Sequence, residues 1–449
     1  MAMEIKAVNC LEKIKEDDLK YNLHTWTAQG ALDPKVITKT KGIYFWDAEG
    51  KRYYDMSSQL VNVNIGHGNQ KVIESIKEQA EKLPFMGPAF AFKSKSEAAK
   101  KIIEVAPDNM GKVFFTNAGA EANENAIKIA KMFTGRDKIM SAYRSYHGAS
   151  YGAANLSGEV RRLPSEPGIP GFIKFHGPYL YRTPIEFKTE KEATDYYLKL
   201  LREQIEFEGA DKIAAIFQES VVGSNGILIP PEGWMEGVRE ICDEYGILMV
   251  CDEVMSGWGR TGEWFAINNW DVKPDMISFA KGVTCGYAQL GGVIVSKKIA
   301  EYFNENKLWC GLTYNGHPIG CAAACATIDV YKELDLLKKS KEMGAILGEI
   351  LEDLKEKHTC VGDVRYIGLF SAIELVKDKT TKEPLVPYGK DPENTMKKIL
   401  KILHSEGFWT YSHGNNIIVA PPLIITEQEL REAMGIMDKV LDFVDNMNK

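Results

Sequence analysis

No stretch of the 449 residues approaches the roughly 20 consecutive apolar residues that a membrane-spanning helix needs. A basic excess is missing too: the net charge is −7, and no stripe of lysine and arginine favours nucleic-acid binding. Residues 1–20 are mixed and charged, without the apolar segment of a signal peptide. We therefore expect a soluble cytoplasmic protein with no membrane and no nucleic-acid partner.

Cysteine patterns of metal sites or disulfide frameworks are also missing. The eight cysteines are scattered, with no Cys-x-x-Cys pair and no cysteine–histidine cluster at zinc spacing. We therefore expect no metal site and reduced, buried thiols. Cys321 and Cys325 enclose three alanines, and this run of small residues predicts a tightly packed helix.

The phosphate-binding loop of nucleotide hydrolases is absent. Asp252-Glu253 follows the apolar run 247–251, like the acidic strand of such enzymes, but they also need Gly-x-x-x-x-Gly-Lys-Ser/Thr. No Gly-Lys pair of the chain is followed by serine or threonine; the pairs stand at 50–51, 111–112 and 389–390. A nucleotide hydrolase is therefore a weak alternative. A purely structural alternative is that this strand-end carboxylate only caps a loop.

Apolar runs that alternate with amphipathic stretches are what the chain does have. Between residues 113 and 296 they predict strands that are apolar on both faces, separated by helices. This pattern implies an α/β domain with a mostly parallel sheet covered by helices. The expected strands are 113–116, 139–142, 213–217, 247–251, 277–280 and 292–295, with helices at 120–133 and 234–245. Ligands of such sheets bind at the carboxyl ends of the strands.

The two ends of the chain predict a second, smaller α+β domain. Its expected elements are a helix at 332–357, strands at 368–374 and 416–420, and a last helix at 426–447. Thr426 and Glu429 have the spacing of a capping box. Residues 42–47 and 52–55 predict a hairpin that packs with the C-terminal part. The predicted division is 1–65 for the N-terminal segment, 66–330 for the large domain and 331–449 for the small domain.

One carboxylate and one amine are predicted to lie at the edge of the large sheet. Asp252 ends one apolar run, and Lys281 closes the run 277–280 in a stretch with little other charge. A desolvated lysine has a lowered pKa and can hold an aldehyde cofactor as a Schiff base. A carboxylate can keep the ring nitrogen of that cofactor protonated. Each residue alone has an ordinary alternative, a surface lysine or a loop-capping aspartate.

Two further segments suit the same chemistry. Residues 116–123 run from a strand through small residues into a helix, whose free N–H groups and dipole form a phosphate site. A plain turn with Asn117 as N-cap is the alternative. If phosphate binds there, Glu121 and Glu124 must point away from it. Tyr146, after another predicted strand, can stack on a flat cofactor ring or pack in the core.

Taken in order, these segments resemble the class III aminotransferases, the pyridoxal-phosphate family that includes the ω-amino acid transaminases. The shared motifs reach from about residue 42 to residue 422. They are Asn-x-Gly-x-Glu-Ala at 117–122, Tyr-His-Gly at 146–148, Glu219 in Gln-Glu-Ser-Val-Val-Gly, Asp-Glu-Val at 252–254, Gly-Arg-Thr-Gly at 259–262, Lys-Gly at 281–282 and Thr-Tyr-Asn-Gly-His-Pro at 313–318. The resemblance implies fold-type I architecture, pyridoxal 5'-phosphate as cofactor, and an active site shared by two subunits of a homodimer or a dimer of dimers.

The resemblance also implies roles for single residues. Lys281 would hold the cofactor and move the substrate proton, and Asp252 would pair with the ring nitrogen. Glu219 would lie beside the phenolic oxygen. The other cofactor contacts would come from Gly119, Ala120, Tyr146, His147, Val254 and, in the neighbouring subunit, Thr313. Ala120 departs from the family pattern, because many relatives have serine there; a hydroxyl contact is lost while the N–H remains.

The nature of the amine rests on other residues. Residues 24–29 and 144–148 look most like the taurine transaminases, which move the amino group of taurine to 2-oxoglutarate or pyruvate and leave sulfoacetaldehyde. The resemblance implies that Trp26, Leu60 and Val61 line the substrate pocket.

The resemblance leaves the acid group of the substrate without its usual cation. Tyr411 stands where many ω-transaminases have a mobile arginine, and Ala149 stands at the arginine position of the γ-aminobutyrate type. Another cation is then needed: Arg144 first, then Arg161 or Arg162, each of which could instead be a structural ion pair.

The sequence therefore predicts a ping-pong aminotransferase that takes taurine first. β-Alanine, γ-aminobutyrate and putrescine are the alternative amines. A pyridoxal-phosphate aminomutase or racemase would keep every cofactor residue and need no external keto acid. A non-catalytic scaffold would leave Asp252, Lys281 and the phosphate turn unexplained together.

Overall fold

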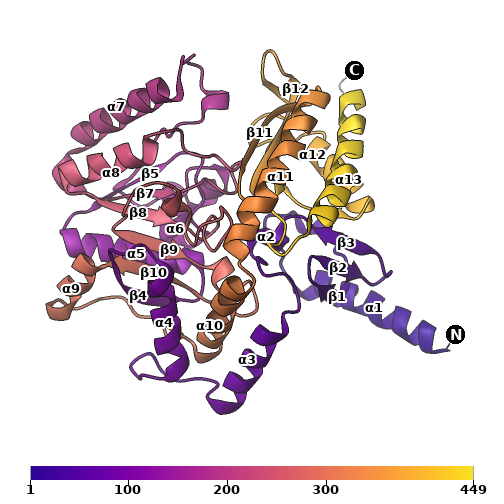
Figure 1. Cartoon of the computed structure of the whole chain (residues 1–449), viewed down its shortest axis with the longest axis horizontal. Helices are drawn as coiled ribbons and strands as arrows, with labels where there is room; N and C mark the ends of the chain where they lie inside the picture. The colour runs from indigo at the N-terminus through magenta and orange to yellow at the C-terminus, as the bar shows by residue number, and fades with distance from the viewer. Residues whose placement is uncertain (1, 448–449) are drawn as a thin grey trace.

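The computed structural model describes residues 2–447, with side chains from residue 11 onward. Figure 1 shows a large domain built on one long sheet and, beside it, the smaller sheets that carry the two ends of the chain. The α/β class predicted from the apolar runs is confirmed. No helix within residues 2–447 combines the length and the apolar character that crossing a membrane requires.

The large sheet is mostly parallel, as predicted from the strands that are apolar on both faces. Its order is β4 (Met110–Thr116), β10 (Gly291–Ser296), β9 (Met276–Phe279), β8 (Leu248–Asp252), β7 (Ile213–Glu219), β5 (Lys138–Ala142) and β6 (Phe172–Phe175). Within this sheet of the described chain, β10 alone runs opposite to the other six strands. Alternate side chains enter two apolar clusters: Met249 and Cys251 one, Leu248 and Val250 the other. Both faces are therefore covered, which explains the unbroken apolar runs.

Helices cover this sheet on both faces. Five of them are α5 (Gly119–Thr134), α6 (Tyr151–Leu156), α7 (Glu190–Glu208), α8 (Trp234–Tyr245) and α9 (Lys297–Glu305). Three more pack against one another at the sheet's edge: α3 (Gln70–Lys82), α4 (Lys93–Val105) and α10 (Pro318–Glu333). Helix α10 contains the predicted run from Cys321 to Cys325, and its buried alanines allow the close approach of α3 and α4. Short 3₁₀ turns lie between these elements at Val160–Ser165, Leu180–Arg182, Ala210–Lys212, Ala266–Asn269 and Lys281–Val283, and another lies in the N-terminal segment at Gln29–Ala31.

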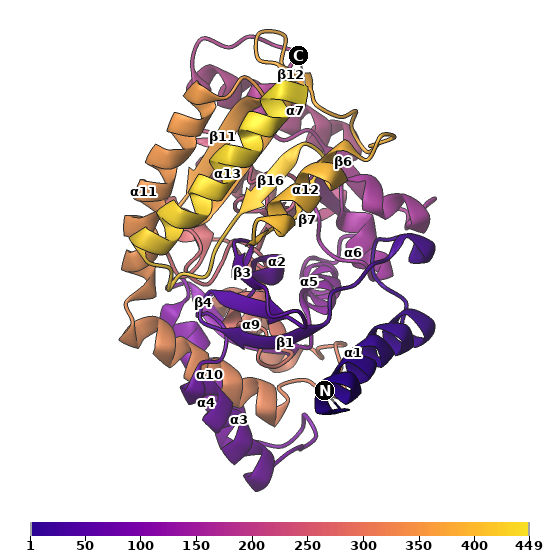
Figure 2. The same ribbon diagram turned by 90° about the vertical axis from the view of Figure 1, so that its right-hand side faces the viewer.

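The small domain is formed by the C-terminal part of the chain. Its sheet holds β11 (Val361–Ile367), β12 (Phe370–Asp378), β16 (Asn416–Val419), β15 (Ser412–His413) and, beside β12, β13 (Glu383–Pro384). The helices are α11 (Leu336–Lys357), α12 (Thr395–Ser405) and α13 (Glu427–Met447). Figure 2 shows α11 and α13 side by side over the sheet.

Two predictions for this domain have different outcomes. The capping box is confirmed, because the N–H of Glu429 donates to Oγ1 of Thr426 and the N–H of Thr426 donates to Oε2 of Glu429. The single helix over 332–357 is wrong. Helix α10 ends at Glu333, Asp335 adopts φ +47°, and α11 begins at Leu336. One left-handed residue turns the chain from the large domain into the small one.

The N-terminal segment joins both ends of the chain. After α1 (Ala2–Tyr21), strands β1 (Ile37–Lys41), β2 (Tyr44–Asp47) and β3 (Arg52–Asp55) form a sheet that β14 (Phe408–Trp409) completes. The predicted hairpin is therefore present, and β3 pairs with a strand more than 350 residues later in the chain. The short helix α2 (Ser58–Val61) then leads toward the large sheet. Among the cysteines that the structure describes, all seven are free thiols.

Candidate active site

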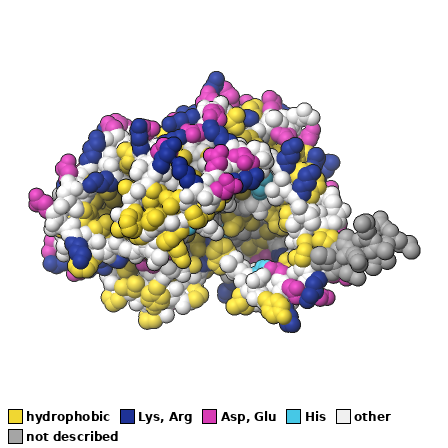
Figure 3. Space-filling model, turned by 90° about the horizontal axis from the view of Figure 1, so that it is seen from below, with side chains coloured by type: hydrophobic (Ala, Val, Ile, Leu, Met, Phe, Trp, Pro, Cys, Tyr) yellow, Lys and Arg dark blue, Asp and Glu magenta, His cyan; other side chains and the backbone are white. Residues whose placement is uncertain are grey.

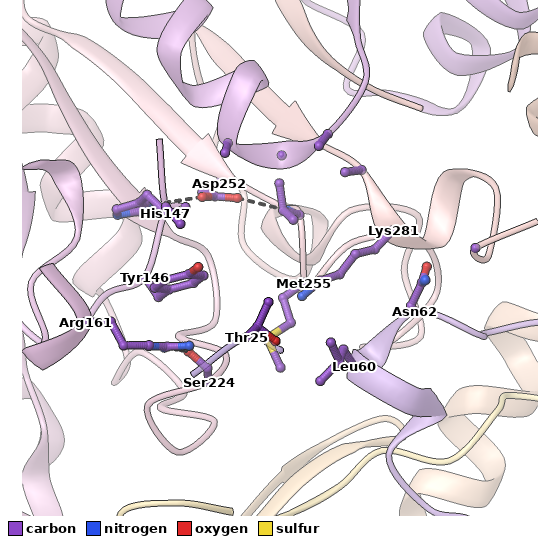
Figure 4. Close-up of a pocket in the computed structure, with 18 of the residues that line it drawn as sticks. Thr25, Leu60, Asn62, Tyr146, His147, Arg161, Ser224, Asp252, Met255 and Lys281 are labelled. Carbon is purple, nitrogen blue, oxygen red and sulfur yellow. Dashed lines mark hydrogen bonds and ion pairs between the residues drawn. The ribbon is translucent and has the colours of Figure 1, made fainter. Parts of the chain in front are cut away.

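A cavity of about 910 Å³ lies where β7, β8 and β9 end. The strand register places Glu219 beside Asp252, and Asp252 beside Ser278, so that the strand-end side chains meet at one edge. Figure 4 shows this pocket with its labelled side chains directed inward. Eleven of the residues predicted from the sequence line it: Trp26, Leu60, Gly119, Ala120, Tyr146, His147, Glu219, Asp252, Val254, Lys281 and Tyr411.

Lys281 reaches into the centre of the pocket (Figure 4). It begins a 3₁₀ turn directly after β9 and has φ +44°, a conformation that L residues rarely adopt. Gly282 permits this turn, because a Cβ there would lie 2.6 Å from Cβ of Trp258. Loss of water around the amine lowers the pKa of Lys281 to about 8, although the carboxylates of Asp252 and Glu219 act in the opposite direction. A substantial fraction of the amine is therefore neutral near pH 8.

Asp252 is buried and held at both oxygens. Its Oδ2 lies 2.7 Å from Nδ1 of His147 and accepts from Nδ2 of Asn123 at 2.7 Å. Its Oδ1 accepts from the N–H of Val254 at 3.0 Å. These contacts fix the carboxylate in one orientation at the end of a rigid strand.

Glu219 ends β7 next to Asp252. Its Oε1 accepts from the N–H of Tyr146 at 3.0 Å, and its Oε2 accepts from the N–H of Gly223 at 2.7 Å. Desolvation raises the pKa of Glu219 to about 7, with the nearby Asp252 acting in the same direction. The carboxyl therefore changes charge close to neutral pH.

Glu253 has a different role from its neighbour in the sequence. Its side chain turns away from the pocket and accepts from the hydroxyls of Ser220 and Ser256 and from the N–H groups of Ala266 and Ile267. Burial raises the pKa of Glu253. It therefore holds two loops together, and of the acidic pair only Asp252 faces the pocket.

The start of helix α5 offers backbone donors to the pocket. The N-cap is Ala118, and no side chain caps the helix, so the alternative with Asn117 as cap is wrong. Glu121 accepts from the N–H and Nδ2 of Asn117, and Glu124 accepts from the N–H groups of Gly152 and Ala153. Both carboxylates are thereby kept away from the N–H groups of the helix start.

The close packing at this turn explains its small residues. A Cβ on Gly119 would lie 2.8 Å from two methyl carbons of Val254, so the helix start and the strand end touch. Free N–H groups at the positive end of a helix suit a phosphate group. The donor set therefore fits the phosphate of pyridoxal phosphate, with Lys281 and Asp252 at the same cavity for its aldehyde and its ring nitrogen.

An arginine faces the pocket on the side opposite Lys281. The guanidinium carbon of Arg161 lies 3.7 Å from the ring centroid of Tyr146 and 5.3 Å from that of Trp26. Its Nε donates to Glu159 at 2.5 Å and its Nη2 donates to Ser224 at 2.8 Å. Figure 4 shows the guanidinium lying along Tyr146 with Ser224 at its end.

Three residues predicted for the substrate pocket lie outside it. Arg144 has φ +63°, and this backbone turn sends its side chain to another cavity, between Tyr179 and Tyr388. Arg162 instead pairs with Glu166, four residues further on. These placements correct the sequence prediction, and among the arginines considered only Arg161 lines the pocket of the described chain.

Val61 corrects the prediction for the other wall. It is 1% exposed and packs in an apolar cluster with Val221, Ile227 and Phe370. A sharp turn with positive φ at Ser58, Gln59 and Val61 separates it from Leu60, which does line the pocket. Tyr411 is also at the pocket, and burial raises its pKa.

The sequence did not single out every residue of the site. Asn123 lies on α5 four positions after Gly119, a helical spacing that could have shown it on the same face. Asn62, Ser224, Met255 and His413 come from loops and short strands, where no periodic pattern marks a pocket-facing side chain. Thr313 is exposed and does not line the pocket of this chain.

Known proteins that are similar to this chain agree with the chemistry that the site suggests. The family model of the class-III aminotransferases matches residues 27–441. The structure of a taurine:2-oxoglutarate aminotransferase from Bifidobacterium kashiwanohense, in complex with PLP and glutamate, is 50% identical, with a TM-score of 0.95. The match covers 97% of this chain and 98% of that one.

Curated relatives are less similar and carry several names. A taurine–pyruvate aminotransferase from Bilophila wadsworthia is 32% identical over 95% of this chain and 96% of its own length. A leucine/methionine racemase from Thermococcus litoralis is 35% identical over 92% of this chain and 91% of its own length. These matches agree with the strand-end lysine and aspartate and with the uncapped helix start. They show that the chain belongs to the class-III aminotransferases, fold-type I enzymes that use pyridoxal phosphate.

Proposed function

We propose that this aminotransferase takes an ω-amine with an acidic group at its far end, and that taurine is its amine donor. The acceptor would be 2-oxoglutarate or pyruvate. The observation that carries the proposal is the pocket-facing guanidinium of Arg161, which suits the sulfonate of taurine or a carboxylate. The similarity to the two taurine aminotransferases supports the same choice.

The cofactor end of the pocket would act through five residues. Bound pyridoxal phosphate supplies an aldehyde that amines condense with and a ring that takes up an electron pair when the substrate C–H bond breaks. Asp252 would hold the proton on the ring nitrogen, because its own oxygens are fixed by His147, Asn123 and Val254. The N–H groups of Gly119 and Ala120 would bind the phosphate, and Tyr146 and Val254 would enclose the ring.

Proton transfer would fall to Lys281. An amine with a pKa of about 8 can accept the substrate's proton in its neutral form and return it as an ammonium near neutral pH. Glu219 would lie near the phenolic oxygen of the cofactor. The same lysine serves both half-reactions, in the order amine first and keto acid second, which is the ping-pong scheme.

Arg161 would orient the acid end of the substrate. Glu159 and Ser224 hold its Nε and Nη2, while Nη1 makes no hydrogen bond to any residue in the described part of the chain. Stacking on Tyr146 fixes the plane of the guanidinium beside the place of the reaction. A diamine such as putrescine would bring a second positive charge to this arginine, which disfavours it.

A racemase is the second candidate, because one relative of similar identity is a leucine/methionine racemase. It would use the same cofactor residues but would leave the amino group on its substrate. The two reactions separate in one assay. Mixing the enzyme with amine and no keto acid converts the bound cofactor to its amine form only in an aminotransferase.

We also propose a homodimer or a dimer of dimers, located in the cytoplasm, with the domain division 1–65, 66–330 and 331–449. Figure 3 looks onto the face that carries α3 and α4, where hydrophobic side chains gather in patches. Phe85 and Tyr314 lie 5.8 Å apart between ring centroids and are 43% and 54% exposed, beside Thr313. An aromatic pair this exposed is expected to be covered by a second copy, which would bring Thr313 to the partner's cofactor.

The test of the amine is a panel with a matched pair of variants. Taurine, β-alanine, γ-aminobutyrate and putrescine are assayed against pyruvate and 2-oxoglutarate. We expect Arg161→Gln to raise the KM for taurine by about 10- to 100-fold, the loss of one charged hydrogen-bonded pair, and to leave putrescine no worse. Arg162→Gln removes the same charge outside the pocket and should change neither. Putrescine outrunning taurine in the wild type would contradict the proposal.

A further inference from the structure

A second cavity, of about 520 Å³, lies beside the active-site pocket at the seam between the two domains. The two cavities share Ser412 and His413 as a common wall. We refer to the second one as the seam cavity. Its lining carries four basic side chains, Arg144, Arg182, Lys390 and Lys397, against two acidic ones, Glu374 and Asp391. None of the functions proposed above uses this space.

Both carboxylates of the seam cavity are already engaged. Glu374 accepts from the hydroxyl of Tyr179, from Nε of Arg182 at 2.6 Å and from Nη1 of Arg365 at 2.8 Å. These donors hold the pKa of Glu374 below its usual value, against the effect of its burial. Asp391 accepts from the N–H groups of Thr395 and Met396 and so caps helix α12. The excess positive charge is therefore not neutralised from within.

Of the two arginines that line the seam cavity, Arg144 is the one without a hydrogen-bond or ion-pair partner among the described residues. Its guanidinium makes no hydrogen bond or ion pair with any residue in the described part of the chain. The guanidinium carbon lies 4.9 Å from the ring centroid of Tyr179 and 5.4 Å from that of Tyr388. The left-handed backbone at Arg144, held by its N–H to the carbonyl of Gly158 at 3.2 Å, points the side chain there. Two aromatic rings thus fix the planar guanidinium of Arg144, whose N–H groups lack an acceptor.

A buried amide gives an independent sign of a missing acceptor. Asn225 is 4% exposed, lines the seam cavity, and its Nδ2 finds no acceptor among the residues that the structure describes. Nη2 of Arg182, another lining residue, is buried without an acceptor in the same sense. An unsatisfied buried donor costs about 1–3 kcal/mol. Two such donors and one unpaired arginine at one cavity are accounted for by an anionic ligand.

We propose that the seam cavity binds a small oxyanion ligand, with Arg144 as its principal partner and Asn225 and Arg182 as further donors. The guanidinium of an arginine can donate two parallel hydrogen bonds to a carboxylate, a phosphate or a sulfonate. The ligand is therefore defined by its oxyanion group. The cavity has room for a molecule larger than a single ion, such as a di- or tricarboxylate. This site is separate from the amine pocket, and its existence does not depend on which amine the enzyme uses.

The experiment titrates the holoenzyme, in buffer without amine or keto acid, with citrate, inorganic phosphate and methanesulfonate by calorimetry. Three variants remove one arginine each: Arg144→Gln at the seam cavity, Arg161→Gln at the amine pocket, and Arg431→Gln on the exposed face of α13. We expect at least one anion to bind saturably to wild type. Its affinity should fall about tenfold or more in Arg144→Gln and stay within about twofold in the other two.

Two results would overturn the proposal. One is no saturable binding of any of the three anions to wild type. The other is an equal or larger loss in Arg161→Gln, which would place the anion in the amine pocket. Should Arg144→Gln fail to fold, as judged by its thermal midpoint, Asn225→Ala decides: a loss of about fivefold or more supports the seam cavity, and unchanged affinity contradicts it. The anion that binds most tightly identifies the ligand class.

Discussion

The active-site pocket has two ends that are built in different ways. The cofactor end is formed by Gly119, Asp252 and Lys281, which lie at a helix start and at strand ends of one sheet, together with Tyr146 from the loop after β5. The amine end, formed by Trp26, Leu60, Arg161 and Tyr411, comes from separate loops and turns that the sheet does not order. Under the proposed function, rigid elements would therefore hold the cofactor chemistry, and loops would hold the choice of amine.

The two ends also differ in how completely their side chains are held. Asp252 is 4% exposed and hydrogen-bonded at both oxygens, whereas Trp26 and Leu60 are 61% and 52% exposed in the single chain. Changes at the cofactor end should therefore abolish the reaction for every amine. Changes at the amine end should alter which amine reacts.

The largest effect is expected for Lys281→Ala. Without the amine, the cofactor loses its covalent attachment and the substrate proton loses its acceptor, so turnover should fall about 10⁴-fold or more for all amines. The visible absorbance band of the lysine-bound cofactor should vanish. Lys174→Ala removes another lysine whose pKa is lowered to about 8 by burial, but one away from this pocket. That control should keep both the band and the activity.

The next effect is expected for Asp252→Asn. An amide cannot hold a proton on the ring nitrogen, so turnover should fall by about 10²–10³-fold for every amine, with the KM for taurine changed less. Stopped-flow half-reactions with taurine and with β-alanine would measure it. Asp243→Asn, at an exposed ion pair on α8, is the matched control and should stay near wild type. Unequal losses for the two amines would break the contrast between the ends.

A smaller effect follows from the pKa of Lys281, which burial lowers from 10.5 to about 8 in the cofactor-free protein. The neutral amine rises from about a tenth of the molecules at pH 7 to about nine tenths at pH 9, so covalent cofactor capture should accelerate about ninefold. Binding of pyridoxine 5'-phosphate, which lacks the aldehyde, is the control and should not follow this curve. A capture rate that is flat from pH 7 to pH 9 would contradict the lowered pKa.

The same shift has a defined consequence for stability. Because the pKa of Lys281 is lower in the folded than in the unfolded chain, the unfolded state binds more protons between about pH 8 and 10.5. The contribution of this group to the free energy of unfolding therefore rises with pH across that window. Below about pH 8 its destabilising effect is fully present. The cofactor-free Lys281→Ala variant should lose this particular rise when denaturant unfolding is compared across the window.

The smallest effects separate two neighbours, Leu60 and Val61. Leu60→Ala should leave the free energy of unfolding within about 0.5 kcal/mol of wild type but change the KM values of amines relative to one another. Val61→Ala opens a space in a buried cluster and should cost about 1–2 kcal/mol, with the order of amines unchanged. Denaturant unfolding and the amine panel measure both. The reverse pattern would contradict the placement of Leu60 at the pocket and of Val61 in the apolar cluster.

The same contrast explains what could be predicted from the sequence. The cofactor end was predictable because apolar runs locate the strands, and strand ends in a parallel sheet meet at one edge. The amine end was not, because a single backbone angle decides where a loop side chain points. Positive φ at Arg144 directs it to the seam cavity, and the turn at Ser58 and Gln59 buries Val61. The helix break at Asp335 was not predicted either, because both flanking segments are good helix formers and nothing in the sequence marks the left-handed residue.

The assignment of Lys281 as the cofactor-binding residue is tested most directly by finding the lysine that carries the cofactor. Holoenzyme is reduced with borohydride, which makes the covalent link permanent, and its peptides are mapped by mass spectrometry. We expect the pyridoxyl mass on Lys281 alone, in one copy per chain, and no such mass in Lys281→Ala. A pyridoxyl group on Lys174 or on any other lysine of the wild type would contradict the assignment of the active site.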